Sequence, residues 1–386
     1  MFLLSRNLQR LPPYLFVEID KAKRKARAEG RDIIDLGIGD PDQPTPKHII
    51  EALYAAAQDS ANHRYALDQG MPVLRRSISE WFSRRFGVSL NPDTDILPLI
   101  GSKEGIAHFP CAYLNNGDIS LIPDPCYPPY KGGTILAGGK PCLMPLRESN
   151  DFLPDLKKIP VAARKKARIL YINYPNNPTS ATAEKSFYRQ VIDFALKNKI
   201  IVVSDLAYSE MSYEGYKPLS ILEVEGGRDV AIEFHSLSKT FNMTGWRIGW
   251  ACGNPELVAA LAKVKSNVDS GIFSAIQLAG VAALEGGDEH IRNMRTLYQE
   301  RRDILVAGLK KLGWKAMSPR ATFYVWIKVP PKTDSMRFAA LILEKANIVV
   351  TPGVGFGEYG EGFIRMALTV PVERIREALE RLQKIA

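Results

Sequence analysis

Cysteine is scarce in this sequence and is not arranged for metal or disulfide chemistry. The four cysteines, Cys111, Cys126, Cys142 and Cys252, are dispersed, and no two of them stand in a CxxC spacing. Zinc sites and disulfide frameworks depend on such spacing or on a much higher density of cysteine. We therefore expect buried free thiols, no disulfide and no bound metal ion.

Long apolar runs, internal repeats and low-complexity tracts are also missing. No apolar run approaches the roughly 18 residues that span a bilayer, and the charges of the N-terminal stretch lie on the wrong side of its apolar part for a signal peptide. Charged residues make up 24% of the chain and apolar residues 46%, which is the balance of an ordinary globular protein. The sequence predicts a soluble, cytoplasmic protein with no membrane partner.

The chain carries a net charge of +9, and five of its cations fall between residues 21 and 27. We expect this basic run to form the solvated face of a helix, because no nucleic-acid motif and no interleaved aromatic residues accompany it. Small anionic ligands would account for part of the positive potential. No nucleic-acid partner is predicted.

Short apolar, β-branched runs alternate with longer amphipathic segments in the middle of the chain. The runs of strand length are 95–100, 119–123, 169–173, 200–204, 230–235 and 247–252. Helical patterns such as 103–114 and 185–197 lie between them. This alternation predicts an α/β fold with a mostly parallel sheet between layers of helices. Ligands of such sheets bind beyond the carboxyl ends of the strands, so we expect the chemistry in the polar segments that follow them.

The pattern changes near Gly286, and a chain of 386 residues is long enough for two domains. A long charged helix over 288–312 is followed by a short strand, a further helix and the strand-like FIRMALTV. We expect residues 1–46 to form an arm and part of the small domain, 47–285 the large domain, and 286–386 the rest of a smaller α+β domain.

The most informative segment is SLSKTFNMTGWRIGW, which directly follows a predicted strand. Ser236 and Ser238 stand close to Lys239, and Arg247 follows eight residues later. A lysine at a strand end among dipoles and cations can lose its proton and form a Schiff base with an aldehyde as the neutral amine. The hydroxyls and the arginine are suited to a phosphate. Taken alone, the segment leaves open a surface lysine in a serine-rich turn.

This segment is similar to the cofactor-lysine motif of the class I/II aminotransferases, which are fold-type I pyridoxal-phosphate enzymes. The resemblance extends over nearly the whole chain, from LPPYLFVEIDKAK to FIRMALT, with several motifs in the family's order. It implies pyridoxal 5'-phosphate bound to Lys239 and the transamination of an amino acid with a 2-oxo acid. In that reaction the lysine amine, once freed, moves the α-proton of the substrate.

Three further residues resemble the family's contacts to the cofactor ring. Asp205, at the end of IIVVSD, resembles the carboxylate that keeps the pyridine nitrogen protonated, so that the ring can accept electrons. Asn177 in NYPNNPTS and Tyr208 resemble the pair that contacts the ring hydroxyl. Each of these residue types also ends strands or makes turns, and it is the order of the motifs that favours the functional interpretation.

The phosphate and the ring face have their own candidates. GSKEG opens a predicted helix, so the amides of Ser102 and Lys103 and the helix dipole can cradle a phosphate, as in the family's phosphate-binding turn. Tyr127 in DPCYPPY resembles the aromatic residue that stacks on the ring. We expect its neighbours Cys126 and Tyr130 only to pack.

The resemblance also implies substrate contacts and a partner subunit. Arg365 in FIRMALT matches the arginine that binds the substrate α-carboxylate through two parallel hydrogen bonds. Gly39 in LGIGDP resembles the glycine that lies against the same carboxylate, where Asn177 is also expected. Tyr65 in RYALDQG resembles the tyrosine that reaches the phosphate of the neighbouring subunit, which implies a homodimer with its active site at the interface.

Several of these motifs together are most similar to the LL-diaminopimelate aminotransferases of the prokaryotic type, which act in a route to lysine. That substrate carries a second amino-acid head. Lys103, Tyr14 and Asn267 are the candidates for contacts with it, and Asp68 in YALDQG, where we would expect a glutamate, is the candidate partner of the distal ammonium.

Other activities remain open at this point. Aspartate, alanine and aromatic aminotransferases share the fold, although an aspartate enzyme would need a second arginine that no motif here provides. A carbon–sulfur β-lyase shares the lysine motif and diverges after α-proton removal. A non-catalytic regulator would need a DNA-binding module, for which the chain has no spare residues.

Overall fold

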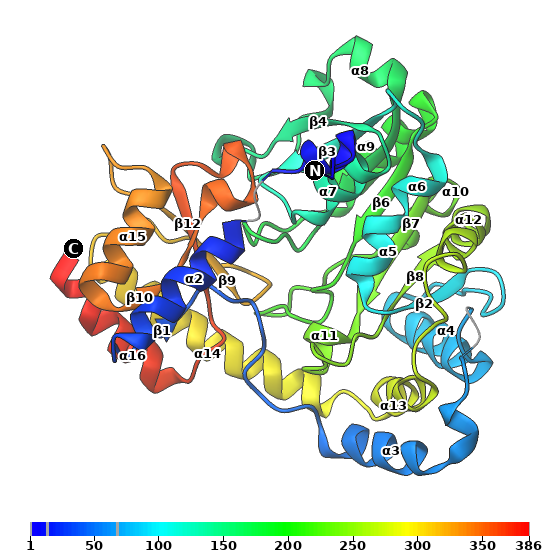
Figure 1. The fold of residues 1–386 in the computed structure, drawn as a ribbon, viewed down its shortest axis with the longest axis horizontal. Coiled ribbons are helices and arrows are strands. Elements are labelled where there is room, and N and C mark those ends of the chain that lie inside the picture. The colour runs from blue at the N-terminus through cyan, green and yellow to red at the C-terminus, as the bar shows by residue number, and fades with distance from the viewer. Residues whose placement is uncertain (1, 13–14, 67–68, 386) are drawn as a thin grey trace.

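The computed structural model describes residues 2–12, 15–66 and 69–385, and Figure 1 shows a larger part built on a long sheet beside a smaller part that holds the C-terminus. The strands of the large sheet are β2 (Ile96–Leu99), β3 (Ile119–Asp124), β4 (Lys140–Pro145), β5 (Ala167–Ile172), β6 (Ile201–Asp205), β7 (Ala231–Ser236) and β8 (Gly249–Gly253). Those of the smaller sheets are β1 (Ile34–Asp35), β9 (Tyr324–Lys328), β10 (Ile348–Val349), β11 (Thr351–Pro352) and β12 (Phe363–Ala367).

Helices surround both parts. The longer ones are α2 (Leu15–Ala28), α3 (Lys47–Gln58), α4 (Pro72–Phe86), α5 (Ser102–His108), α7 (Pro129–Leu136), α9 (Lys185–Asn198), α12 (Pro255–Lys265), α13 (Ser274–Glu285), α14 (Glu289–Lys311), α15 (Ser335–Ala346) and α16 (Val372–Leu382). The short ones are α1 (Arg6–Gln9), α6 (Pro110–Tyr113), α8 (Val161–Lys166), α10 (Gly227–Val230) and α11 (Leu237–Thr240).

The large sheet has the strand order β2-β8-β7-β6-β5-β3-β4, and β8 runs antiparallel to both of its neighbours. The other paired neighbours are parallel, so the mostly parallel sheet predicted from the alternating pattern is confirmed. The prediction missed β4, whose KPCLMP sequence has few β-branched residues. It also gave one helix over 103–114, whereas α5 and α6 are separate, with Pro110 as the first residue of α6.

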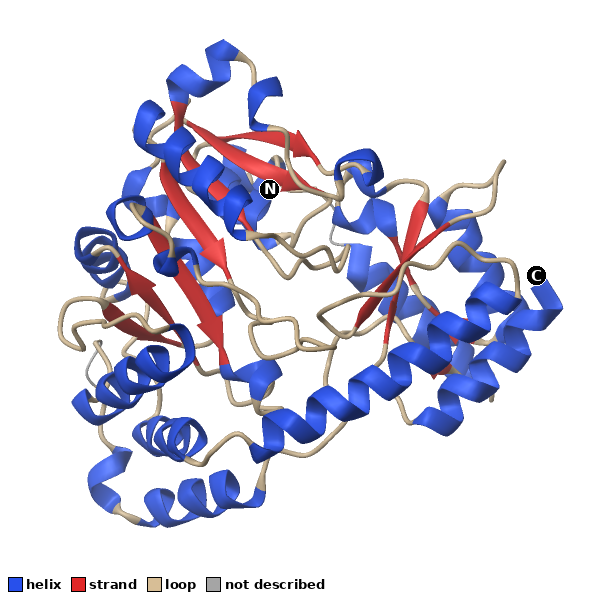
Figure 2. Ribbon diagram, turned by 180° about the vertical axis from the view of Figure 1, so that it is seen from behind, coloured by secondary structure: helices blue, strands red, loops and turns tan. Residues whose placement is uncertain are grey.

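Both faces of this sheet are covered, as Figure 2 shows from behind. Leu170 and Ile172 pack on one side with α4, α9 and α13, whereas Ile169 and Tyr171 pack on the other with α5, α7 and α12. Successive residues of a strand point to opposite faces, so a strand buried on both sides must be apolar throughout. That requirement explains the continuous apolar runs in the sequence.

The smaller part has its own apolar core. Strands β11, β12 and β9 form an antiparallel sheet, and β1 pairs with β10 in parallel. Residues from α14, α15 and α16 join Ile34 and Leu36 of the N-terminal segment in this core. The helix α14 continues from the larger part into the smaller one (Figure 1).

The basic run of residues 21–27 lies on α2, as predicted, but it is not wholly solvated. Lys23 is buried and forms ion pairs with Asp35 at 3.1 Å and Asp20 at 3.2 Å, while the other four cations are exposed. Among the described residues, no helix has the length and hydropathy needed to cross a membrane.

Candidate active site

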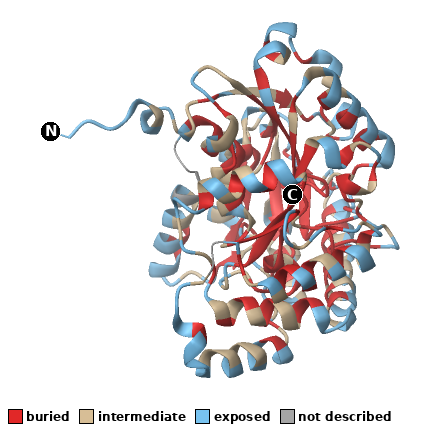
Figure 3. Cartoon of the chain, turned by 90° about the vertical axis from the view of Figure 1, so that its right-hand side faces the viewer, coloured by how far each residue is buried: buried red, intermediate tan, exposed pale blue. Residues whose placement is uncertain are grey.

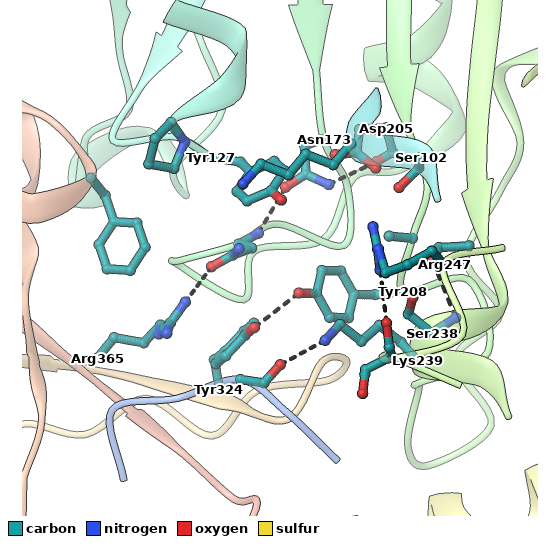
Figure 4. Close-up of a pocket in the computed structure, with 18 residues that line it drawn as sticks. Ser102, Tyr127, Asn173, Asp205, Tyr208, Ser238, Lys239, Arg247, Tyr324 and Arg365 are labelled. Atoms are coloured by element: carbon teal, nitrogen blue, oxygen red, sulfur yellow. Dashed lines mark hydrogen bonds between the residues drawn. The ribbon is translucent and has the colours of Figure 1, made fainter. Parts of the chain in front are cut away.

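A cavity of about 240 Å³ lies where the carboxyl ends of the parallel strands face the smaller part (Figure 4). The segments that follow β2, β3, β5, β6 and β7 all contribute to its lining, as expected for a sheet of this type. Its lining residues are Gly39, Ser102, Lys103, Tyr127, Pro128, Asn173, Asn177, Asp205, Ala207, Tyr208, Ser236, Ser238, Lys239, Thr244, Arg247, Tyr324, Phe356 and Arg365.

Lys239 lies on α11, the single helical turn that follows β7. Ser236 caps this turn, because its hydroxyl accepts a hydrogen bond from the amide of Ser238 at 3.2 Å. The Lys239 ammonium donates to the carbonyl oxygen of Gly39 at 2.6 Å. Burial lowers the pKa of Lys239 from its usual 10.5 to about 8, and the positive charges of Arg365 and Arg247 act in the same direction. The lysine is therefore prepared to react as a neutral amine.

One end of the cavity is suited to a phosphate. Ser102 begins α5, and Ser238 and Arg247 lie on the same side of the cavity, which Ser236 also lines. Gly101 has a positive φ of 76°, and a Cβ there would stand 2.2 Å from Nη2 of Arg247. Glycine at this position lets the guanidinium approach the turn closely. Amides, hydroxyls and a guanidinium thus converge, which is the donor set that a phosphate dianion requires.

Asp205 ends β6 at the floor of the cavity and is buried. Burial raises its pKa to about 6, against the lowering effect of the hydrogen bond from Tyr130. Its Oδ2 accepts this bond at 2.6 Å, whereas its Oδ1 has no partner among the described residues. A buried carboxylate oxygen without a partner is costly, so the site is built for a donor that the protein does not itself supply. A protonated ring nitrogen meets that need.

Arg365 on β12 reaches the opposite side of the cavity. Its Nη1 donates to Oδ1 of Asn177 at 2.7 Å, and its Nη2 donates to the carbonyl of Gly37 at 2.8 Å. The guanidinium lies 4.1 Å from the ring centre of Tyr324 and 4.7 Å from that of Phe356. These contacts fix a planar cation for the recognition of a carboxylate.

Tyr208 and Tyr324 form the side of the cavity between Lys239 and Arg365 (Figure 4). Their hydroxyls are 2.9 Å apart and share a hydrogen bond. A Cβ on Gly39 would lie 1.9 Å from the hydroxyl of Tyr324, so a residue without a side chain is required beside this pair. The Gly39 carbonyl can consequently approach Lys239.

The structure brings most of the predicted site residues into one cavity. Those that line it are Gly39, Ser102, Lys103, Tyr127, Asn177, Asp205, Tyr208, Ser236, Ser238, Lys239, Arg247 and Arg365. Tyr65 and Asn267 do not line the cavity. Tyr65 is 91% exposed, and Asn267 is exposed with its amide bonded to the carbonyl of Lys263 at 2.8 Å. Tyr14 and Asp68 lie outside the described residues.

Sequence reasoning missed several residues of the site. Tyr130, expected only to pack, binds Asp205. Asn173 accepts the amide of Asn177 at 2.8 Å and donates to the carbonyl of Asp205 at 2.7 Å, so it holds two predicted residues together. A polar residue directly after a buried strand was the available signal. Tyr324 and Phe356 come from the smaller part, and no local pattern marks them.

The described residues of the cavity fit pyridoxal 5'-phosphate. The amine of Lys239, the partnerless Oδ1 of Asp205 and the phosphate-suited turn all contribute to the lining of one cavity, with Tyr127 as the candidate for the ring face. An aldehyde, a ring nitrogen and a phosphate are the three groups of that cofactor that need such partners.

Comparison with known proteins agrees with this geometry. The family Aminotransferase class I and II matches residues 31–382. An LL-diaminopimelate aminotransferase of Aquifex aeolicus is 53% identical over 385 residues, which cover 100% of both chains. The enzyme of the same name from Syntrophobacter fumaroxidans is 53% identical over 385 residues, covering 100% of this chain and 99% of its own.

Among solved structures, the substrate-bound BacF of Bacillus subtilis superposes with a TM-score of 0.96 at 38% identity, covering 100% of this chain and 98% of its own. Fold, cavity and relatives thus agree on one chemistry. The chain belongs to the class I and II aminotransferases, and it is a pyridoxal-phosphate-dependent enzyme whose substrates are amino acids and 2-oxo acids.

Proposed function

We propose that this enzyme transfers an amino group between LL-2,6-diaminopimelate and 2-oxoglutarate, in the lysine-forming direction from tetrahydrodipicolinate and glutamate. The support for this substrate is the name shared by relatives that are 53% identical over the full chain. The observation that carries the transamination itself is the placement of Lys239 and Arg365 on facing sides of one cavity that Asp205 also lines.

The shape of the site supports a long substrate. Lys103, Pro128 and Phe356 line both the active-site cavity and a neighbouring cavity of about 550 Å³. A diamino dicarboxylate needs room for its second head beyond the reacting carbon, and Lys103 is a cation at the junction of the two cavities. Of the described lining residues, Arg247 and Arg365 are the arginines, and the first lies on the phosphate side.

Different residues of this chain would bind the substrate, transfer the proton and balance the charge of the cofactor. Bound pyridoxal phosphate supplies the electron sink for the substrate α-carbon. Arg365 binds the α-carboxylate and orients the substrate, while Asn177 fixes the plane of its guanidinium. Lys239, with its pKa near 8, can take a proton from the α-carbon as the neutral amine and return it as the ammonium. Asp205 is ionised above about pH 6 and so can balance a cationic ring nitrogen.

The test is turnover with matched donors. The holoenzyme is incubated with LL-diaminopimelate and 2-oxoglutarate, and glutamate is measured beside parallel reactions with aspartate, alanine, phenylalanine and the meso isomer. We expect fast and stereoselective use of LL-diaminopimelate, with Lys239→Ala as the inactive blank. Turnover of another donor but not of this one would replace the substrate assignment. Keto acid formed without consumption of 2-oxoglutarate would instead identify a β-lyase.

We also propose that the enzyme works as a homodimer in the cytoplasm, and two features support the dimer. Tyr65 and Asn267 are predicted site residues that lie outside the cavity of their own chain, so a second chain could supply them. Phe2, Leu3 and Leu4 expose apolar side chains on an N-terminal segment that projects from the body (Figure 3). Apolar groups gathered at the surface are typical of protein interfaces.

Co-expression of two defective chains tests the shared site. A Lys239→Ala chain and a Tyr65→Ala chain each lack one part of the predicted site, but a hybrid dimer contains one complete copy. We expect the hybrid to regain activity and tight cofactor binding up to about half of the wild-type level. Activity no higher than the average of the two variants would contradict a site shared between subunits.

A further inference from the structure

The larger and smaller parts meet directly beside the substrate arginine, at two segments that are distant in sequence. Asp124 ends β3, and its Oδ1 accepts a hydrogen bond from the amide of Tyr359 at 2.9 Å. Two residues later the amide of Cys126 donates to the carbonyl of Phe356 at 2.9 Å. The segment that carries Tyr127 is thereby joined to the segment of residues 353–360, which we name the Phe356 segment.

The fit between Asp124 and the Phe356 segment is close. Asp124 is only 1% exposed. Gly357 has a φ of +141°, and a Cβ on it would lie 2.2 Å from both carboxylate oxygens of Asp124. No other residue could present its backbone to the carboxylate at this distance, and few could adopt this φ. The contact therefore depends on both residues.

The electrostatics of Asp124 follow from its burial. Desolvation raises its pKa to about 6, while the amide of Tyr359 and the charge of Lys131 lower it and Glu358 raises it. Above that pH the group is a carboxylate. A buried carboxylate that is satisfied by backbone amides binds them more strongly than a neutral acceptor would.

Phe356 connects the anchored segment to Arg365, the residue expected to bind the substrate carboxylate. Its ring lies 4.7 Å from the guanidinium of Arg365, which Tyr324 covers on another side at 4.1 Å. The same ring lies 6.2 Å from that of Trp326 on β9, between ring centres, and belongs to one apolar cluster with Leu146 of the larger part. Leu146 is itself tied to Asp124, because its amide donates to the Asp124 carbonyl at 2.8 Å.

We propose that Asp124 is a positioning residue for substrate binding: it anchors the Phe356 segment, which holds the Arg365 guanidinium in place for the substrate α-carboxylate. This inference rests on the proposed function only in assuming that Arg365 receives that carboxylate. It assigns no role to Asp124 in proton transfer or in contact with the cofactor.

The proposal predicts a specific pattern of defects in the holoenzyme. Asp124→Ala should raise KM for the amino donor at least tenfold and change kcat less than threefold, with the absorption band of the bound cofactor unchanged. Asp124→Asn retains an acceptor oxygen for Tyr359 and should show a smaller rise. The donor is whichever amino acid the wild-type enzyme uses, so a different substrate would leave this test intact.

Two readouts that do not depend on turnover complete the test. Affinity for an α-methyl amino acid, which has no α-proton to lose, should fall in parallel with the rise in KM. Hydrogen exchange of residues 353–360 should become at least tenfold faster. Asp118→Asn is the matched control, because Asp118 precedes the opposite end of β3 and likewise accepts a backbone amide, that of Asn115 at 2.9 Å. It should change neither readout.

Gly357→Ala tests the same contact from the other side and guards against misfolding of the Asp124 variants. It should force the Phe356 segment away from an intact Asp124 and raise KM in the same way. Unchanged KM and exchange in both Asp124→Ala and Gly357→Ala would overturn the proposal. So would an equal loss of kcat and cofactor binding, which would place Asp124 in the cofactor site.

Discussion

The hydroxyl of Tyr130 donates a hydrogen bond to Oδ2 of Asp205 at 2.6 Å, and Oδ1 of the same carboxylate has no partner among the described residues. The phenol itself stays neutral, because burial and the nearby Asp205 charge raise its pKa well above the usual value. The ring of Tyr130 is held by stacking on Tyr171, with centroids 4.9 Å apart. Tyr130 thus favours the ionised form of Asp205 and fixes its orientation.

We predict that Tyr130→Phe lowers kcat/KM about tenfold, since a hydrogen bond to a charged group contributes about 1.5 kcal/mol. The pKa of Asp205 should rise further above 6 without this donor, so the acidic limb of the pH profile should move to higher pH. Tyr171→Phe is the control, because its hydroxyl makes no hydrogen bond in the described part of the chain. An identical pH profile in both variants would refute the role of Tyr130.

Because of Lys239, the free energy of unfolding of the cofactor-free protein should increase as the pH rises. Its folded-state pKa of about 8 lies below the usual 10.5, so the unfolded chain binds more protons between these values and stability increases as pH rises through them. Lys239→Met, which cannot be protonated, should be more stable than the wild type at pH 7 by on the order of 2 kcal/mol. Urea unfolding at pH 7 and pH 9.5 measures the difference. The difference in stability between the variant and the wild type should be smaller at pH 9.5 than at pH 7. An equal difference at the two pH values would contradict the lowered pKa.

Arg301 and Asp42 should support the loop that carries Gly39. The buried Arg301 makes two bonds to Asp42, at 2.6 and 2.8 Å, and a third to the carbonyl of Leu368 at 3.0 Å. Lysine cannot reproduce this planar arrangement, so Arg301→Lys should cost roughly 2 kcal/mol of stability and raise KM. Thermal unfolding and steady-state kinetics test both effects. Arg320→Lys, at an exposed ion pair with Glu184, should be neutral.

Gly39→Ala should damage the site by contact with Tyr324. The new methyl group would lie 1.9 Å from the tyrosine hydroxyl, so the Tyr208–Tyr324 bond would have to break or the loop would have to move. Ring atoms Cζ and Cε1 of Tyr324 would also lie only 2.6 and 2.7 Å from that methyl group. We expect kcat/KM to fall at least tenfold, and the double variant with Tyr324→Ala, which removes the hydroxyl and the ring, to recover part of the loss. Gly132→Ala, where a Cβ meets nothing within 4 Å, is the control. A double variant no better than the single one would exclude this clash as the cause.

The sequence could predict the large sheet because its strands are buried on both faces and are therefore apolar throughout, as 169–173 and 200–204 illustrate. It could not predict β4, which lies at the edge of the sheet and has partly exposed residues. Burial is a property of neighbours, and an edge strand has neighbours on one side only. Its sequence is correspondingly less constrained.

The main site residues could also be predicted from the sequence, because they lie at the ends of these strands. Asp205 ends a parallel strand, and Lys239 and Asn177 each follow one, so local sequence already places all three at the same edge of the sheet. Their order and the resemblance that they carry were sufficient to identify the cofactor. The shifted pKa values of Lys239 and Asp205 could not be predicted from the sequence, because they depend on burial and on charges that are distant along the chain.

What the sequence determined by itself was most of the predicted site residues that line one cavity and the alternation of strands and helices that builds the sheet beneath them. Only the tertiary structure decided which residues support those groups. Tyr130 and Asp205 are 75 positions apart, and Asp124 and Tyr359 are 235 apart. Local periodicity in the sequence cannot predict such pairs. A hydrogen bond between distant segments depends on where the fold places them in space, and no fixed spacing along the chain accompanies it.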